Sequence, residues 1–362
     1  MKTIGVIGAG QLGQMLGSAA GALGLKCIFL DPSENPPASS VGKVVQADFD
    51  DESALASLAD TCDVITYEFE NVPVAAVRAI ESTCPVFPPP FALEQAQDRL
   101  LEKQLFQSLD IPIPGYCAID SAADLLKAAE SLGLPLVVKT RRLGYDGKGQ
   151  SILRNAADAA SVFDALGGHD LIAEQFVPFE REVSAIGARD ETGNIVTYAL
   201  SENEHRDGIL RLSRAPAKGD QLRLTADDYL HRLLTKLEYV GVLALELFVT
   251  ANDLLANEYA PRVHNSGHWT IEGATTSQFE NHLRAIAGIA LADTSVVGFP
   301  GMVNIIGSMP DDLSVLRAAD AVVHDYGKTA RPHRKLGHAT VVGKNPEDRE
   351  KWLRDAQHSL TT

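Results

Sequence analysis

The sequence predicts a mixed α/β and α+β fold, in which a domain with a parallel sheet precedes a larger region of antiparallel strands. Its 362 residues suggest two or three domains, since a domain averages roughly 150 residues. Apolar, β-branched runs alternate with helical patterns over residues 2–69, which is typical of βαβ units. Further along, apolar runs at 240–249 and 254–260 flank a short polar turn and predict a β-hairpin.

The expected elements follow in order. A cluster of prolines, Pro85, Pro88, Pro89 and Pro90, interrupts the pattern and is expected to close the first domain. Before it, strands are expected at 2–10, 26–32, 44–47 and 63–69, and helices at 10–25 and 52–60. After it, helices are expected at 92–109, 222–237 and 278–291, and strands at 134–140, 151–154, 171–177 and 180–188 in addition to the hairpin.

Composition excludes several classes of function. The net charge of −16 is spread along the chain and repels phosphate backbones, so we expect no nucleic-acid partner. No apolar run approaches the roughly 20 residues of a membrane helix, and the N-terminus reads as a strand rather than a signal peptide. The four cysteines are widely spaced without a CxxC pair, which argues against a zinc site or a disulfide framework and indicates a reducing, cytoplasmic location.

The first motif is a glycine loop, Gly8-Ala9-Gly10-Gln11-Leu12-Gly13, which follows a strand and opens a helix. Free N–H groups at a helix N-terminus bind anions, and glycines let a phosphate approach the backbone. Asp31 ends the next strand, where dinucleotide-binding proteins place a ribose carboxylate. The loop therefore predicts anion binding, either by a nicotinamide dinucleotide or by another phosphate.

The second motif is a lysine followed by a glycine-spaced loop. Lys139 ends the apolar strand 134–140, and residues 144–150 read GYDGKGQ. A lysine in this position places a charge in a largely desolvated cleft, and such a loop can fold over a triphosphate through its N–H groups. The spacing of a Walker loop is absent. A surface loop with incidental lysines is the alternative.

Carboxylates dominate the third and fourth motifs. Residues 174–177 (EQFV), with Glu182 beyond them, are placed to present backbone groups to an adenine and a carboxylate to a ribose.

In the hairpin, a turn centred on Asn252 makes Glu246 and Glu258 face each other across the strands. Opposed carboxylates destabilise a sheet unless a cation neutralises them, and magnesium bridging substrate phosphates is the natural candidate. A solvated outer face of the hairpin is the alternative.

Two polar clusters follow the hairpin. Residues 262–268 (RVHNSGH) combine a guanidinium, imidazoles, an amide and a hydroxyl, which suits a small anionic, polyhydroxylated substrate. Arg331, Arg334 and Lys335 place three cations within five residues of an acidic chain and can hold a phosphate monoester. A solvated basic loop explains the second cluster almost as well.

In this order the motifs resemble the ATP-grasp superfamily. The segments GAGQLGQM, VITYEFENV, KTRRLGYDGKGQ, AEQFVPFEREVS and NEYAPRVHNSGHWT are similar, over almost the whole chain, to its 5-(carboxyamino)imidazole ribonucleotide synthetase branch. Many ATP-grasp enzymes carry E-x-N-P-R; here Glu258 to Arg262 reads EYAPR, a departure that this branch shares. The resemblance implies an ATP-grasp fold with a Rossmann-like pre-ATP-grasp domain at 1–98, an ATP-grasp region at 99–295 with a lid lobe at about 135–200, and a small C-terminal domain at 296–362.

The resemblance also implies the ligands and their residues. ATP and Mg²⁺ are the expected cofactors, and aminoimidazole ribonucleotide and bicarbonate the substrates, in a homodimeric enzyme of purine biosynthesis. The implied metal ligands are Glu246 and Glu258. The implied ATP site comprises Arg99, Lys139, Gly144, Tyr145, Asp146, Gly147, Lys148, Gly149, Gln150, Glu174, Gln175, Phe176, Val177, Glu182, His205, Asn257 and Glu258. The implied ribonucleotide site comprises Gln11, Glu68, Tyr145, Asp146, Lys148, Arg262, His264, Asn265, Ser266, Arg331 and Lys335.

The implied reaction has two steps. Bicarbonate attacks the γ-phosphorus of ATP while magnesium and Lys139 counter the charge, and the resulting carboxyphosphate carboxylates the exocyclic amine of the ribonucleotide. Catalytic roles fall to Lys139, Asp146, Arg262 and His264, with either His264 or Asp146 orienting the amine or taking its proton. The glycine loop then binds the ribonucleotide phosphate. The alternatives are a formate-dependent ribonucleotide transformylase, a Rossmann NAD-dependent oxidoreductase and an inactive ATP-binding module.

Overall fold

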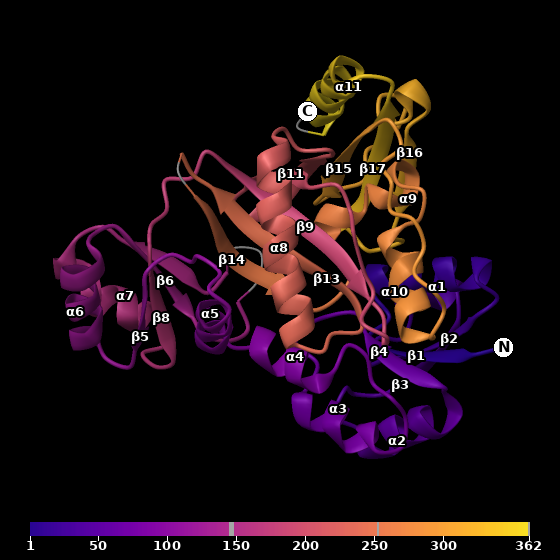
Figure 1. The fold of residues 1–362 in the computed structure, drawn as a ribbon, viewed down its shortest axis with the longest axis horizontal. Helices are drawn as coiled ribbons and strands as arrows, with labels where there is room; N and C mark the ends of the chain where they lie inside the picture. The colour runs from indigo at the N-terminus through magenta and orange to yellow at the C-terminus, as the bar shows by residue number, and fades with distance from the viewer. Residues whose placement is uncertain (145–147, 252, 361–362) are drawn as a thin grey trace.

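The computed structural model describes residues 1–144, 148–251 and 253–360. Three parts are visible in Figure 1: an N-terminal domain in indigo, a small lobe at the left, and a large sheet between them that the C-terminal strands extend. None of the described helices combines the length and apolarity needed to cross a bilayer.

The N-terminal domain is the expected parallel α/β unit. Its sheet has the order β3-β2-β1-β4, and all its neighbouring strands run parallel. Both faces are buried, as parallel sheets require: Ile4 and Val6 pack in the cluster that contains α1, whereas Ile7 and Leu30 pack with α2 and α3. The elements are β1 Thr3–Ile7, α1 Gln11–Ala22, β2 Lys26–Asp31, η1 Pro37–Ser40, β3 Lys43–Gln46, α2 Glu52–Thr61, β4 Val64–Tyr67, α3 Val74–Glu81, α4 Pro90–Ala96 and α5 Arg99–Ser108.

The small lobe is an antiparallel sheet of order β5-β8-β6-β7 with helices on one face. Leu125 and Ala128 of α6 are fully buried against Val138 and Leu171 of the sheet. The lobe extends from the rest of the molecule and carries Lys139 at the end of its second strand in sequence. Its elements are β5 Tyr116–Ile119, α6 Ala122–Leu132, β6 Leu136–Thr140, β7 Gln150–Leu153, η2 Ala156–Asp158, α7 Ala159–Ala165 and β8 Leu171–Gln175.

The large sheet contains nine of the described strands, in the order β14-β13-β9-β11-β12-β15-β17-β16 with β10 paired to β9. Helix α8 crosses one face of it in Figure 1, and its Leu230 and Leu233 are fully buried there. Its strands are β9 Arg181–Arg189, β10 Ile195–Thr197, β11 Ser201–Arg206, β12 Ile209–Arg214, β13 Gly241–Val249, β14 Leu254–Ala260, β15 Phe299–Ile306, β16 Val322–Asp325 and β17 Lys335–Gly343. Its helices are α8 Asp220–Lys236, η3 Asn265–Gly267, α9 Thr270–Gly273, α10 Gln278–Ile286, η4 Ala318–Asp320 and α11 Pro346–Ser359.

The expected bounds of several elements differ from the observed ones, and three differences stand out. The helix expected at 92–109 is split into α4 and α5, because the Asp98 carboxylate caps the second helix and binds Arg141. The sheet of the small lobe spans 116–175 rather than about 135–200, since β9 pairs along its whole length with β13 and belongs to the large sheet. Helix α10 ends at Ile286, five residues earlier than expected, where Gly288 adopts a φ of 66°.

Candidate active site

A cleft of about 610 Å³ opens where the three parts meet. Its walls come from β6 and β8 of the small lobe, from the β13–β14 hairpin and from the loops after β1 and β4 of the first domain. This volume falls in the range of small-molecule sites. The cleft therefore joins, in one space, the motifs that are scattered between residues 11 and 335.

At the small-lobe end, a buried carboxylate lies between two lysines. The carboxylate oxygen Oε2 of Glu174 on β8 is 3.1 Å from Nζ of Lys139 and 3.5 Å from Nζ of Lys103 on α5. Burial alone would raise the pKa of Glu174, but the two ammonium groups outweigh it and hold that pKa at about 2. Lys103 also donates a hydrogen bond to the carbonyl of Asn257. The network fixes Lys139 at the mouth of the cleft.

We expect Lys103→Met to destabilise the protein and to weaken nucleotide binding. The side chain is almost completely buried, and its loss leaves Glu174 with one cationic partner instead of two. Removing one member of a buried ion pair costs about 3–5 kcal/mol, which thermal melting and denaturant titration will measure. Lys127→Met is the matched control, because Lys127 is exposed and pairs only locally with Asp124. Equal stability of the two variants would contradict the assigned network.

The predicted pairing of the two glutamates is confirmed: Glu246 and Glu258 are Cα partners on β13 and β14. Burial and then the proximity of Glu258 raise the pKa of Glu246. The register shifts by one residue just beyond this pair, so that Asn257 is the extra residue of a bulge. Within the described part of the chain, the buried Oδ1 of Asn257 has no hydrogen-bond partner.

This arrangement fits a hard divalent cation. Two carboxylates and an unpaired amide oxygen are the oxygen ligands that Mg²⁺ prefers, and a cation would relieve the repulsion between the glutamates. The side chains beside the pair are weakly placed to do so: Nη2 of Arg99 is 4.0 Å from Glu258, and the imidazole of His264, whose Nε2 is 3.2 Å from Glu246, has a pKa lowered well below its usual value by burial.

Further groups line the same half of the cleft. His205 on β11 shares a hydrogen bond with Glu182 on β9; burial lowers the pKa of His205, but this bond and nearby Glu246 outweigh it and raise that pKa. Phe179 and Phe248 stack with ring centroids 4.7 Å apart. A flat aromatic wall beside a carboxylate–imidazole pair suits a nucleoside.

The glycine loop of the first domain binds a carboxylate of the protein itself. The N–H groups of Gly10 and Gly13 both donate hydrogen bonds to Glu68, which follows β4. A Cβ atom at Gly8, whose φ is 103°, would lie 2.4 Å from Cγ of Glu68, so this glycine makes room for the glutamate. Glu68 therefore occupies two of the N–H groups that the sequence pattern predicted to bind a substrate phosphate.

Asp31 also binds the backbone of the glycine loop. Its Oδ2 accepts a hydrogen bond from the N–H of Ala9 at 2.9 Å, and its Oδ1 accepts one from Ser33 at 2.8 Å. A carboxylate engaged in this way is not presented to the ribose of a dinucleotide. The geometry disfavours the oxidoreductase alternative.

Cations gather beside the loop instead. Lys328, in the segment between β16 and β17, donates a hydrogen bond to Oε1 of Gln11. Burial, and then the nearby charges of Arg334 and Lys335, lower the pKa of Lys328 to about 8. Lys335 lines the cleft at the start of β17. This corner offers positive charge to an anionic group.

Arg262 and His264 lie between the two ends of the cleft. Arg262 binds Glu70. Burial by itself would raise the pKa of Glu70 and lower that of Arg262, but the attraction between the two groups outweighs burial, so the pKa of Glu70 is lowered, that of Arg262 is raised and both side chains are ionised. Burial and the neighbouring cations lower the pKa of His264 well below its usual value. Nδ1 of His264 lies 2.8 Å from Oγ of Ser266 and accepts from the Ser266 N–H, so Nε2 carries the proton and faces Glu246.

Most of the predicted site residues that the structure describes line this cleft. Ser266 is completely buried behind His264, Arg331 is exposed on the surface, and Gly149 is set back from the wall. Tyr145, Asp146 and Gly147 lie outside the described residues. The predicted residues that line the cleft are Gln11, Glu68, Arg99, Lys139, Gly144, Lys148, Gln150, Glu174, Gln175, Phe176, Val177, Glu182, His205, Glu246, Asn257, Glu258, Arg262, His264, Asn265 and Lys335.

Sequence reasoning missed four residues that shape the site. Lys103 and Lys328 are separated in sequence from the groups they contact, by 154 and 317 residues respectively, so no local pattern marks them. Residues 67–70 read YEFE, so Glu70 follows Glu68 at a spacing of two. This spacing could have indicated a second carboxylate beside Glu68. Phe248 follows Glu246 at a spacing of two on the same strand face, which was a usable signal for a wall residue.

Comparisons with known proteins agree with this geometry. Three family models match: the ribonucleotide synthetase preATP-grasp domain at residues 1–97, the ATP-grasp domain at 104–279 and the phosphoribosylaminoimidazole carboxylase C-terminal domain at 301–351. The N5-carboxyaminoimidazole ribonucleotide synthase of Pseudomonas aeruginosa is 49% identical over 338 residues, which cover 93% of this chain and 94% of that protein.

Solved structures extend the match to the whole fold. The N5-carboxyaminoimidazole ribonucleotide synthetase from Thermus thermophilus superimposes with a TM-score of 0.95 at 48% identity, covering 99% of both chains. The N5-carboxyaminoimidazole synthase from Aspergillus clavatus, in complex with ADP and 5-aminoimidazole ribonucleotide, gives a TM-score of 0.92 at 30% identity and covers 99% of this chain and 98% of that one. The chain therefore belongs to the N5-carboxyaminoimidazole ribonucleotide synthase family of ATP-grasp ligases.

Proposed function

We propose that this protein uses ATP and bicarbonate to carboxylate the exocyclic amine of 5-aminoimidazole ribonucleotide, giving ADP and phosphate. One observation carries the proposal: the pair of Lys139 and Glu174, the glutamate pair, and the corner of Gln11 and Lys335 all border one cleft, and Lys328 donates a hydrogen bond to Gln11 there. A nucleoside triphosphate at one end and a phosphorylated amine at the other would meet at Glu246 and His264. The relative from Aspergillus clavatus binds ADP and this ribonucleotide, in agreement with two adjacent sites.

In the first step, an oxygen of bicarbonate attacks the γ-phosphorus of ATP, the bond to the β-phosphate oxygen breaks, and ADP leaves. Lys139, held by Glu174, would contact the transferring phosphoryl group, and Arg99 would add a second positive charge near Glu258. Mg²⁺, bound by Glu246 and Glu258 with the amide of Asn257 beside them, would supply charge neutralisation there.

In the second step, the amine nitrogen bonds to the carboxyl carbon of carboxyphosphate, or of CO₂ released from it, and phosphate departs. The amine must lose a proton. We propose that His264 orients the amine rather than accepts this proton, because Ser266 occupies its Nδ1 and its Nε2 proton faces Glu246. Of the two residues that the sequence offered for this role, we therefore propose Asp146 as the base.

We propose further that the ribonucleotide phosphate binds at Lys328, Lys335 and Gln11 rather than on the glycine-loop N–H groups. Glu68 would then face the sugar hydroxyls, where a carboxylate acceptor is useful, instead of the phosphate. Magnesium dependence, a homodimer, a cytoplasmic location and domain boundaries near residues 98 and 295 complete the proposal. All four cysteines are free thiols, in accord with a reducing compartment.

A pH dependence follows from Lys328. Its pKa of about 8 means that the ammonium is present below that pH and lost above it, so attraction for the phosphate falls as the pH rises. We expect kcat/KM for the ribonucleotide to decline about tenfold per unit above pH 8, since this ratio reports the free enzyme. Lys328→Arg should move the decline to higher pH, because a guanidinium stays charged. A wild-type profile identical to that of Lys328→Arg would contradict the assignment.

Phosphate release tests the proposed reaction. It should require ATP, bicarbonate and 5-aminoimidazole ribonucleotide together, and it should lack dependence on formate. Stimulation by formate in CO₂-free buffer would instead identify the transformylase alternative. Phosphate release that is insensitive to the ribonucleotide would contradict the proposed substrate.

A further inference from the structure

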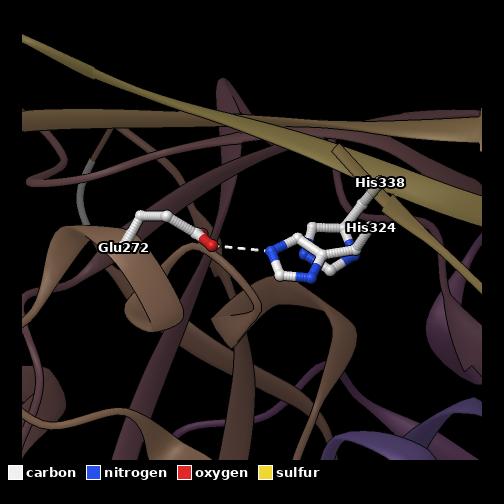
Figure 2. A group of neighbouring side chains, drawn as sticks. All are labelled: Glu272, His324 and His338. Carbon is white, nitrogen blue, oxygen red and sulfur yellow. Dashed lines mark hydrogen bonds and ion pairs between the residues drawn. The ribbon is translucent and has the colours of Figure 1, made fainter. Parts of the chain in front are cut away.

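A second cluster of chemically active side chains lies outside the cleft, where α9 meets β16 and β17 (Figure 2). His324 and His338 are Cα partners on the two strands, and their rings stack with centroids 4.4 Å apart. Glu272 of α9 points at them, with Oε1 2.6 Å from Nε2 of His324. One ligand atom from each residue lies within 4.8 Å of the others.

Two atoms of this cluster are buried without a hydrogen-bond partner in the described part of the chain: Nε2 of His338 and Oε2 of Glu272. His338 is completely buried, and a buried polar atom left unpaired is costly. Protein interiors therefore rarely leave such atoms without a partner. Both atoms belong to side chains that ligate metals.

The surroundings prepare His338 as a ligand. Nδ1 of His338 lies 2.8 Å from the hydroxyl of Tyr326. With the proton on Nδ1 and shared with Tyr326, the lone pair of Nε2 is directed to the unpaired side. A hydrogen bond of this kind to the second ring nitrogen orients most metal-binding histidines.

We propose that Glu272, His324 and His338 bind one divalent transition-metal ion such as Zn²⁺, with water completing the coordination. Two imidazoles and a carboxylate suit an ion of intermediate softness. In a tetrahedral site, ligand atoms lie roughly 3.4 Å apart, so the present spacing of at most 4.8 Å has to contract by up to about 1.4 Å through side-chain rotation. The cysteine pattern argued against a zinc site, but this one uses imidazole and carboxylate ligands alone.

A metal ion could reach this cluster from solvent, and its binding would link two parts of the fold. His324 and Tyr326 line a surface hollow of about 330 Å³ that Gln14 and Ser18 of α1 also border, which opens the cluster to solvent. Helix α9 follows directly on the segment that carries His264, whereas β16 and β17 belong to the C-terminal strands. A bound ion would therefore brace the active-site segment against the C-terminal part of the sheet.

The test is a Zn²⁺ titration of the full chain by calorimetry, after removal of metal by chelation and with excess Mg²⁺ present to fill the cleft. We expect one equivalent of Zn²⁺ to bind and to raise the melting temperature. His324→Asn and Glu272→Gln should each weaken the affinity at least tenfold, a typical loss for a disturbed metal site. His324 is partly exposed, so its substitution is expected to leave the fold intact, which circular dichroism will check.

Two controls separate this cluster from other binding. His231→Asn removes an exposed histidine of α8 that contacts its own helix, and it should leave Zn²⁺ affinity unchanged. Glu246→Gln disables the cleft and should also leave it unchanged. The proposal is overturned if wild-type protein binds no stoichiometric Zn²⁺, if the two cluster variants bind as tightly as wild type, or if only Glu246→Gln abolishes binding.

Discussion

Replacing Glu258 by glutamine is expected to abolish turnover while leaving the fold at least as stable. Glu258 and Glu246 are register partners on adjacent strands, and like charges opposed in this way destabilise a sheet. Glutamine keeps the shape but removes a metal ligand and one of the two repelling charges. We expect kcat to fall at least about 100-fold, the usual effect of losing one group that stabilises a charged transition state. The melting temperature should equal or exceed that of wild type.

Glu204→Gln is the matched control for this experiment. Glu204 lies on β11 of the same sheet and pairs with Arg214 at the surface, so its neutralisation should change neither rate nor stability appreciably. Substantial activity of Glu258→Gln at ordinary magnesium concentrations would refute the metal assignment. A lower melting temperature would show that the two glutamates do not repel each other in the metal-free protein.

Gln11→Glu is expected to raise the KM for the ribonucleotide at least tenfold with little change in the KM for ATP. Gln11 accepts a hydrogen bond from Lys328, and Glu68 already places one carboxylate on the same loop. A second carboxylate would pair with Lys328 and repel the phosphate. One lost hydrogen bond to a charged group is worth about 1.5–3 kcal/mol, which corresponds to a tenfold change or more. Steady-state kinetics with each substrate varied in turn will measure it.

Gln14→Glu adds the same charge one turn along α1, where the side chain faces Ser40, and should leave both constants near their wild-type values. Equal effects of the two substitutions would point to a general charge effect instead of a phosphate site at Gln11. A fluorescence titration with NADH distinguishes the oxidoreductase alternative. Because Asp31 already accepts hydrogen bonds from Ala9 and Ser33, we expect no NADH binding for Asp31→Asn to disturb.

Periodicity and turn chemistry were sufficient for much of the fold and for part of the site. The alternating pattern over residues 2–69 predicted a parallel sheet, which is confirmed: β1 and β4 are buried almost throughout, as strands covered on both faces are, whereas the edge strand β3 is only partly buried. The hairpin pattern predicted that Glu246 faces Glu258, and this pairing is confirmed. It depends on the bulge, however, because the register next to the turn, in which Val249 faces Leu254, would by itself place Asn257 opposite Glu246.

Features that depend on distant contacts were not accessible in the same way. The glycine loop matched a nucleotide fingerprint, yet its N–H groups bind Glu68, which is 58 residues further along the chain from Gly10. The bulge at Asn257 lies between the turn and the glutamate pair, and the carbonyl of Asn257 accepts a hydrogen bond from Lys103 of α5. These contacts are set by tertiary packing, which no periodicity records.

The measurement that tests the central claim most directly is the fate of a bicarbonate oxygen. If bicarbonate attacks ATP to form carboxyphosphate, then ¹⁸O-labelled bicarbonate must transfer one labelled oxygen to each phosphate released. Mass spectrometry of the phosphate, taken before the label exchanges with water, should show that single ¹⁸O in the presence of ATP, Mg²⁺ and 5-aminoimidazole ribonucleotide. Unlabelled phosphate, released while the ribonucleotide is carboxylated, would contradict the account, because the phosphoryl group would then have been transferred to water and not to bicarbonate.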